Sequence, residues 1–208
     1  MLFTPALLWL GGQSANALTL KVVSGDNSGS IAKLVDGDYG SKWEGGWGGS
    51  AYAILKSSAS INPTSYTIVT GNDNATWNGR GWQAWKIYGA NFESDEDATR
   101  DASEWVLIDE KSGITHDIVP DVDSTPFDFE LSSPQESYYS YFKIEVLELQ
   151  GAGYMQMCEF LFKDFTVDLS AFEAQINKCK AFDLTGVNEL LVAEYNAMLE
   201  KLLAAEDP

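Results

Sequence analysis

The segment Asp36-Gly37-Asp38-Tyr39-Gly40-Ser41 brings two carboxylates and a hydroxyl into one short stretch of chain. Asp and Gly are turn formers, so the stretch predicts a turn rich in oxygen atoms. A hard cation such as Ca²⁺ takes six to eight oxygen ligands and accepts backbone carbonyls among them. The segment is not an EF-hand loop, because the spaced third ligand and the distal Glu are missing. From these residues alone, a solvated turn and a cation site both stay open.

A second group of residues carries aromatic rings and hydrogen-bonding groups on turn-rich connections. One long connection holds Asn74, Trp77 and Arg80, and Tyr154 follows a Gly-Ala-Gly sequence. An aromatic ring can cover the apolar face of a pyranose while Arg and Asn groups hydrogen-bond its hydroxyls. Other roles stay open: Arg80 can pair with an acid, Trp77 can pack over the core, and Trp47 can be a ligand-facing tip or a lid.

The residue pattern gives little support for catalysis. His116 is the single histidine, and it lies beside Asp117 without a nucleophile motif. Paired acids such as Asp121 and Asp123 are typical of a solvated surface, and no phosphate-binding Gly loop or zinc spacing is present. We therefore expect a binding protein and not an enzyme.

Composition narrows the class of ligand. The chain has 208 residues, 45% of them hydrophobic, so it can bury a substantial core. Its formal net charge of −18 argues against nucleic acid and against anionic membranes, and it is neutral toward uncharged sugars. No apolar run reaches the roughly 20 residues that a membrane span needs. Cys158 and Cys179 form neither a disulfide framework nor a zinc pattern, so we expect two small buried side chains.

Residues 1–17 have two interpretations: a secretory signal or the remnant of an upstream domain. The stretch is apolar and ends in Ala15-Asn16-Ala17, which resembles a signal-peptidase site, but it lacks a basic start. We expect an exported protein that is secreted or held at the cell surface.

Residues 18–166 predict a mainly β domain, a sandwich or jelly roll, because short β-branched and aromatic runs alternate with turn residues. The expected strands are Thr19–Val23, Ala51–Leu55, Tyr66–Thr70, Ala84–Ala90, Trp105–Glu110, Phe127–Leu131, Tyr141–Leu149 and Glu159–Phe165. Residues 167–208 predict an αα-hairpin with helices from Ser170 and from about Val187 to Ala205. Such a hairpin either packs on the sandwich or begins a bundle, and it offers a surface for a protein partner.

Three segments, in this order, resemble the discoidin family, also called coagulation factor V/VIII type C domains, and its relatives among family 32 carbohydrate-binding modules. The first is Leu34–Trp43, which matches the family's Asp-Gly-Asp-x-x-Thr-x-Trp turn with Ser41 in the Thr place. The second is Ser65–Arg80 followed by Trp85–Asn91, and the third is Tyr141–Val146 leading to Met157–Phe160. The resemblance covers roughly residues 20–163 and leaves the helices outside.

The resemblance implies a jelly-roll β-sandwich of the galactose-binding-domain type with a structural Ca²⁺. Its implied ligands are the side chains of Asp36, Asp38, Ser41 and Glu159 and the backbone carbonyls of Lys33 and Cys158. Independently of the family, a cation that ties residue 36 to residue 159 would close a loop of over a hundred residues, and a clip reduces the entropy of the unfolded chain most when the loop is long. Binding only the folded form would also stabilise it by mass action.

The resemblance further implies that loops at the calcium-bearing end bind a glycan. The implied contacts are Tyr39, Trp47, Asn74, Trp77, Arg80 and Tyr154, with Arg80 and Tyr154 the best matches. We expect a non-catalytic carbohydrate-binding module of a larger exported bacterial protein, with a galactose-type or other neutral sugar as ligand. The alternative is a protein-binding or adhesion module of a cell-surface protein.

Overall fold

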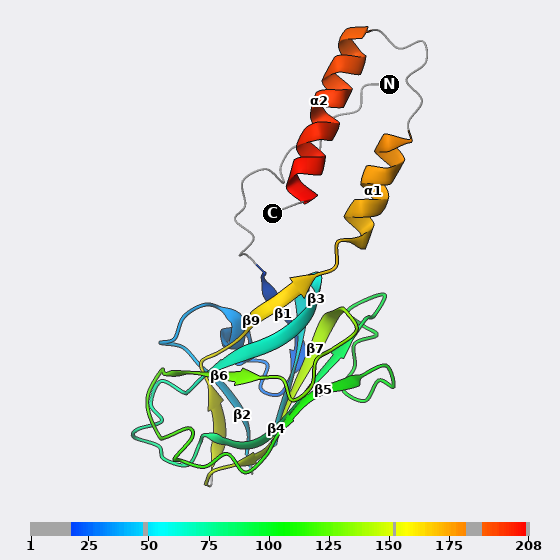
Figure 1. Cartoon of the computed structure of the whole chain (residues 1–208). Helices are drawn as coiled ribbons and strands as arrows, with labels where there is room; N and C mark the ends of the chain where they lie inside the picture. Colours follow the sequence, from blue (N-terminus) through cyan, green and yellow to red (C-terminus); the bar gives the residue numbers. More distant parts are fainter. Residues whose placement is uncertain (1–17, 48–49, 152, 182–188, 207–208) are drawn as a thin grey trace. The chain divides into compact units, whose positions relative to one another are not determined.

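The computed structural model describes residues 18–47, 50–151, 153–181 and 189–206 (Figure 1). The chain divides into two compact units, one spanning Leu18–Val167 and the other containing the residues from Asp168 onward. Residues 1–17, on which the expectation of export depends, lie outside the described residues. Each unit is described by itself below.

The first unit is built from antiparallel β-sheets. The main sheet has the order β1 (Leu20–Gly25), β3 (Ala51–Val69), β7 (Tyr139–Leu149), β4 (Trp82–Ala90) and β5 (Val106–Lys111), and β6 (Pro126–Glu130) and β9 (Glu159–Val167) also pair with β3. A two-stranded sheet joins β2 (Trp43–Trp47) to β8 (Tyr154–Met157), and a 3₁₀-helix, η1, spans Ile31–Val35. This is the mainly β sandwich that the sequence predicts.

Strand β3 belongs to both layers of the sandwich, as Figure 1 shows. Its first part pairs with β1 and β7, and its last part pairs with β6 and β9. Pairing with β7 breaks after Lys56, and the register with β9 shifts after Pro63, which has no N–H to donate. Two separate strands were expected here, and that expectation is wrong: an irregular strand turns the corner between the layers without a loop.

Large side chains from both layers fill the core. Trp43 and Trp85 are both fully buried. The rings of Phe142 on β7 and Phe162 on β9 lie 4.4 Å apart between their centroids, which joins the two layers directly. Burial of such rings is the main stabilising term for a domain of this size.

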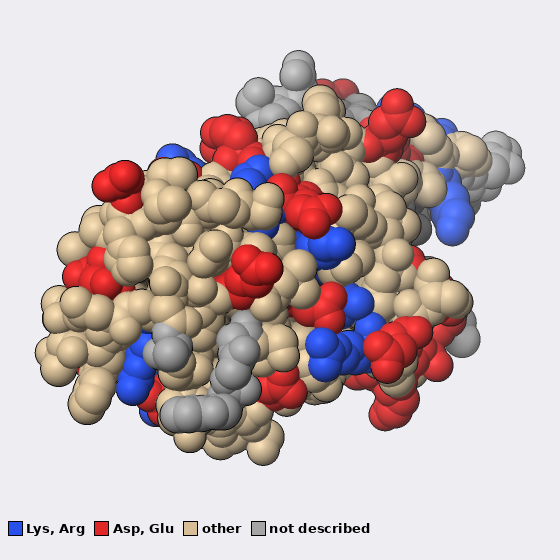
Figure 2. All heavy atoms as spheres, turned by 90° about the horizontal axis from the view of Figure 1, so that it is seen from below, with Lys and Arg blue, Asp and Glu red and all other residues tan. Residues whose placement is uncertain are grey.

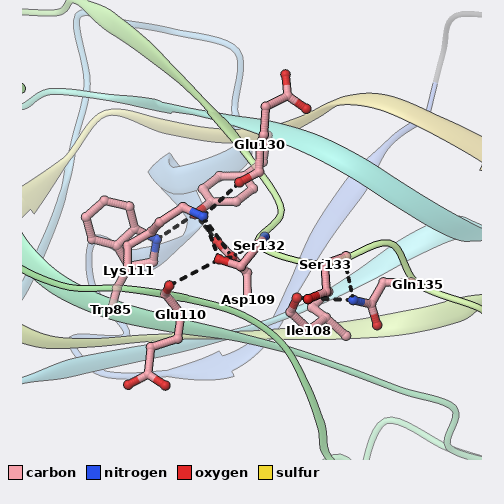
Figure 3. Close-up of polar contacts among 10 residues, drawn as sticks. Trp85, Ile108, Asp109, Glu110, Lys111, Glu130, Ser132, Ser133 and Gln135 are labelled. Carbon is pink, nitrogen blue, oxygen red and sulfur yellow. Dashed lines mark hydrogen bonds and ion pairs between the residues drawn. The ribbon is translucent and has the colours of Figure 1, made fainter.

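A buried carboxylate, Asp109 on β5, adds a polar link between the layers (Figure 3). The Tyr66 hydroxyl donates to it over 2.6 Å, the Ser132 amide and hydroxyl donate over 2.8 and 2.6 Å, and Lys111 Nζ lies 2.9 Å away. The Trp85 indole N–H in turn donates to Tyr66 over 2.8 Å. Burial alone would raise the pKa of Asp109, but the hydrogen bonds from Ser132, Tyr66 and Lys111 outweigh it and lower the pKa.

The sheet of β2 and β8 was not predicted. The backbone of Glu44-Gly-Gly-Trp47 pairs with residues 154–157, although none of the expected strands covers either segment. Packing requires a glycine at position 45, because a Cβ there would lie 2.4 Å from Ala51 Cβ and 2.7 Å from Met155 Cε. Gly45 is therefore explained by the close approach of neighbouring segments and not by a need for flexibility.

The second unit contains two helices, α1 (Ser170–Lys180) and α2 (Glu189–Glu206). The two are linked by a hydrogen bond from the Tyr195 hydroxyl to the Cys179 carbonyl. The first helix begins at Ser170 as expected, its N-cap is Leu169, and the Ser170 amide donates to the Asp168 carboxylate. Among the described residues, neither helix combines the length and apolar character that crossing a membrane requires.

Candidate functional site

The oxygen-rich turn follows η1 and is closed by its own side chains. Gly37 has a φ of +76°, which favours glycine. Asp36 accepts from the Asp38 amide over 2.9 Å and from the Ser41 hydroxyl over 2.7 Å. Asp38 accepts from the Gly40 amide over 2.8 Å. The turn thus brings Asp36 and Ser41 together, whereas the carboxylate of Asp38 faces its own loop.

Glu159, the first residue of β9, meets this turn from far along the chain. Its carboxylate accepts from the Gly37 amide over 2.9 Å, and the residue is only 6% exposed. Burial, followed by the charges of Asp36 and Asp38, raises the pKa of Glu159 to about 7, although the Gly37 amide acts in the opposite direction. The structure therefore places three carboxylates around one turn, with no basic partner among the ion pairs described for the first unit.

The donor set suits a hard cation whose shell includes hydroxyl and backbone oxygens. Among the described residues, no three His, Cys, Asp or Glu side chains are arranged as a metal site. A calcium shell does not need three such groups, because carbonyls and hydroxyls serve equally. Lys33 lies within η1 and Cys158 directly precedes Glu159, so their carbonyls belong to the two segments that meet here. A cavity of about 270 Å³ adjoins Asp36, Gly37 and Glu159.

Trp77 and Arg80 lie together on the loop that joins β3 to β4, which we call the 70–81 loop. The Arg80 guanidinium stands over the Trp77 ring, 4.9 Å from its centroid. Trp77 is 54% exposed, so it does not pack over the core. Arg80 is not among the described ion pairs, although its pairing with an acid had stayed open. The pair forms an exposed cation–π platform.

Tyr154 belongs to the same surface. It was expected in a loop, but it begins β8 and pairs with Trp47 of β2, and it is 44% exposed. A Cβ on the preceding Gly153 would lie 3.8 Å from Arg80 Nε, so the two segments adjoin. We call Trp77, Arg80 and Tyr154 the candidate binding rim. The side chain of Trp47 lies outside what the structure describes.

The oxygen-rich turn and the 70–81 loop are neighbours. The side-chain amide of Asn72 donates to the Gly40 carbonyl, and Lys42 Nζ lies 2.6 Å from Asp73. The Tyr39 carbonyl accepts from the Ser124 hydroxyl over 2.7 Å, and Tyr39 is 38% exposed. The candidate cation site and the candidate binding rim therefore belong to adjoining loops.

Asn74 departs from its expected position. Its side chain is fully buried, so it does not face an exposed ligand surface. Its amide oxygen and that of Gln156 both point to Gly71, where a Cβ would lie 2.5 Å from each. Neither oxygen has a hydrogen-bond partner among the described residues. Asn74 thus lies beneath the loop that carries the rim and not on it.

Sequence reasoning missed two acids that shape this end. Asp121 and Asp123 were interpreted as solvated surface, but they accept the backbone amides of Gly79 and Ala75 over 2.9 and 2.8 Å. No local signal marked these bonds, because the Gly79 and Ala75 amides lie 42 and 48 residues away from the two acids along the chain. Only the fold brings the two loops together.

Acidic and basic side chains are mixed on the face seen in Figure 2. Figure 2 shows one face on which acidic side chains stand in small groups among uncharged surface, with Lys and Arg between them. The described residues on this face form no continuous basic patch of the kind that binds a phosphate backbone.

Comparison with solved structures identifies the fold. A SusE-like protein matches with a TM-score of 0.55 and 15% identity, over 72% of this chain and 64% of its own. A chain from the complex of reduced XRCC1 with the DNA polymerase beta catalytic domain matches with a TM-score of 0.52 and 11% identity, over 71% and 97%. The fold is the discoidin-like β-sandwich.

Several structures with this fold are family 32 carbohydrate-binding modules. That of EndoD from Streptococcus pneumoniae aligns with a TM-score of 0.48 and 13% identity, over 70% of this chain and 95% of its own. At these identities the likeness is one of fold. Comparison with protein-family models gave no match, and comparison with curated protein sequences gave none.

Proposed function

We propose that this protein is a non-catalytic carbohydrate-binding module that holds a glycan on the candidate binding rim. The observation that carries the proposal is the exposed Arg80–Trp77 platform beside Tyr154. An exposed indole supplies an apolar face for a sugar ring, and a guanidinium outside any described ion pair supplies several fixed donors for hydroxyls. The similar carbohydrate-binding modules support the same function, and the position of Trp77, Arg80 and Tyr154 supports them as its contacts.

The proposal includes a structural Ca²⁺ at the neighbouring turn. The side chains of Asp36, Ser41 and Glu159 would hold it, with Asp38 and the carbonyls of Lys33 and Cys158 as further ligands. The buried carboxylate of Glu159 supports this, because an adjacent cation would offset the cost that raises its pKa. The ion would fix the turn that bonds to Asn72 and so steady the start of the 70–81 loop.

The proposal extends to where the protein acts. Glycans that such a module meets are displayed outside the cell, so we place the protein in a secreted or surface-held assembly, with a neutral sugar such as a galactose type as its first candidate ligand. The helices of the second unit are then a connector or a contact for a protein partner.

A glycan array followed by calorimetry tests the function. The wild-type protein should bind at least one glycan, and Arg80→Ala should weaken binding by at least about tenfold, since hydrogen bonds to a charged group carry roughly 1.5–3 kcal/mol. Arg100→Ala is the matched control. Arg100 also stacks on an aromatic ring, that of Tyr52, but it pairs with Glu145 and is not part of the rim.

Three results would contradict the proposal: no binding across the array, equal binding by Arg80→Ala, or equal loss in both Arg variants. Retention of a protein partner through α1 and α2 with no glycan signal would favour the adhesion-module alternative.

A further inference from the structure

We propose that Asp121 is a positioning residue for the candidate binding rim, because its carboxylate fixes the backbone of Gly79 and with it the place of Arg80. This inference rests on the proposed function, since it concerns the same rim. It adds a residue from a different loop, residues 112–125, which the sequence did not suggest as part of the site.

The 70–81 loop bonds to itself only in its first part. The amides of Thr76 and Trp77 both donate to the Asp73 carbonyl, over 3.0 and 2.9 Å. The bonds described for the second part come from other loops: the Gly79 amide donates to Asp121, and the Gly81 carbonyl accepts from the Gln150 amide over 2.9 Å. Arg80 lies between these two bonds, so its position depends on groups outside its own loop.

Two contacts hold the Asp121 carboxylate in one orientation. Its side chain is only 13% exposed, and both of its oxygens are engaged. Oδ1 accepts from the Gly79 amide over 2.9 Å, and Oδ2 lies 2.9 Å from Nε2 of His116. The imidazole thus orients the far side of the carboxylate, and two fixed contacts leave the side chain little rotational freedom.

Gly79 also touches a third loop. Its φ is +80°, and a Cβ there would lie 2.8 Å from the Gly151 Cα, so the backbones of the two loops touch. Gly79 is therefore in contact with both the Asp121 carboxylate and Gly151. A displacement of Gly79 must displace Arg80, because the two are consecutive and β4 begins only at Trp82.

The 112–125 loop can serve as a frame because it is anchored in the core. Val119 is fully buried, and its carbonyl accepts from the Gln150 side chain over 3.0 Å. The Ile114 amide donates to the Gln83 carbonyl on β4 over 3.1 Å. Asp123 makes a similar contact in the middle of the 70–81 loop by accepting from the Ala75 amide over 2.8 Å. A rigid second loop thus presents two carboxylates to the loop that carries the rim.

The test compares Asp121→Ala, Asp121→Asn and Asp117→Ala in the full chain. Asn keeps an oxygen that can accept from Gly79, whereas Ala does not. Asp117 is an exposed acid of the same loop and controls for the change in net charge. With the best glycan from the array, we expect Asp121→Ala to weaken binding by about tenfold or more, while Asp121→Asn and Asp117→Ala stay within about threefold of wild type.

Amide exchange of Gly79, measured by NMR without ligand, provides a readout that does not need a glycan. We expect its protection to be lost in Asp121→Ala and kept in Asp121→Asn, with Ile144 in β7 unchanged in both. Undiminished binding by Asp121→Ala, or equal loss in the Ala and Asn variants, would overturn the positioning role. Failure of the wild type to bind any glycan would instead overturn the proposed function, while the exchange data would still test whether Asp121 holds Gly79.

Discussion

At the scale of single residues, the distinction that matters is between polar groups that serve the fold and polar groups that are available to a ligand. Asp109 belongs to the first kind, since four donors converge on a side chain without exposed surface. Arg80 belongs to the second, since it stands on an exposed ring. The sequence pointed to Arg80 through its loop, but Asn74 on the same loop proved to be buried, because one loop contributes side chains in both directions.

Loss of the Asp109 carboxylate should be costly. We expect Asp109→Ala to lower the free energy of unfolding by about 3 kcal/mol, because it leaves Lys111 and Tyr66 without their buried partner. Urea denaturation at neutral pH measures this. Glu110→Ala is the control, since the Glu110 side chain is half exposed and its pair with Lys86 should be worth under about 1 kcal/mol.

The same carboxylate predicts the sign of a pH effect. The pKa of Asp109 is lowered on folding, so its contribution is complete above the unfolded pKa of about 4 and is lost as pH falls through the folded value. Wild type should therefore lose stability toward pH 3 more steeply than Asp109→Ala. Parallel stability curves for the two proteins across this range would contradict the assignment.

At the scale of elements, the strands with dense β-branched and aromatic residues were predictable, and those defined by contacts were not. The strands predicted at residues 84–90 and 141–149 begin within two residues of β4 and β7 and end at the same residues. Their apolar and aromatic side chains are typical of a buried strand. Strands β2 and β8 are short, and β2 contains two glycines, so only their mutual pairing reveals them. The turn at Asp36 was predictable for a different reason, since Asp and Gly impose it locally.

Gly45 in β2 provides a test at this scale. We expect Gly45→Ala to destabilise the protein by about 2 kcal/mol, because the new methyl would overlap Ala51 and Met155 in a packed layer. Gly29→Ala is the matched control, since its Cβ would meet nothing closer than Asn27 at 3.6 Å. Chemical denaturation of both variants is the measurement, and equal stability of the two would contradict the packing account.

At the scale of the whole molecule, segments far apart in the chain meet at the turn of residues 36–41. Hydrogen bonds link the turn at residues 36–41 to Glu159, to Asn72 and to Ser124. A cation at the turn would therefore act on the stability of the whole first unit. It would also act on the loop next to the rim. This coupling could not be foreseen from residue types, because it depends on which loops the sandwich brings together.

Calcium should raise the melting temperature, and a chelator should reverse the rise. At a concentration a hundredfold above Kd the gain is about 2.7 kcal/mol, which corresponds to several degrees. Glu159→Gln should remove the response without lowering the melting temperature measured in chelator near pH 7.5, because burial and the neighbouring acids make its ionisation unfavourable. Glu110→Gln, which changes a half-exposed side chain of β5, is the control. An undiminished calcium response in Glu159→Gln would contradict the site.

The most direct test of the central claim is a hydrogen-exchange footprint of the full chain with its best glycan. The account predicts that binding slows exchange in residues 71–81 and 153–157, with the sheet strands β1 and β5 and the helices α1 and α2 unchanged. A footprint on those strands or helices, with residues 71–81 and 153–157 unaffected, would contradict it.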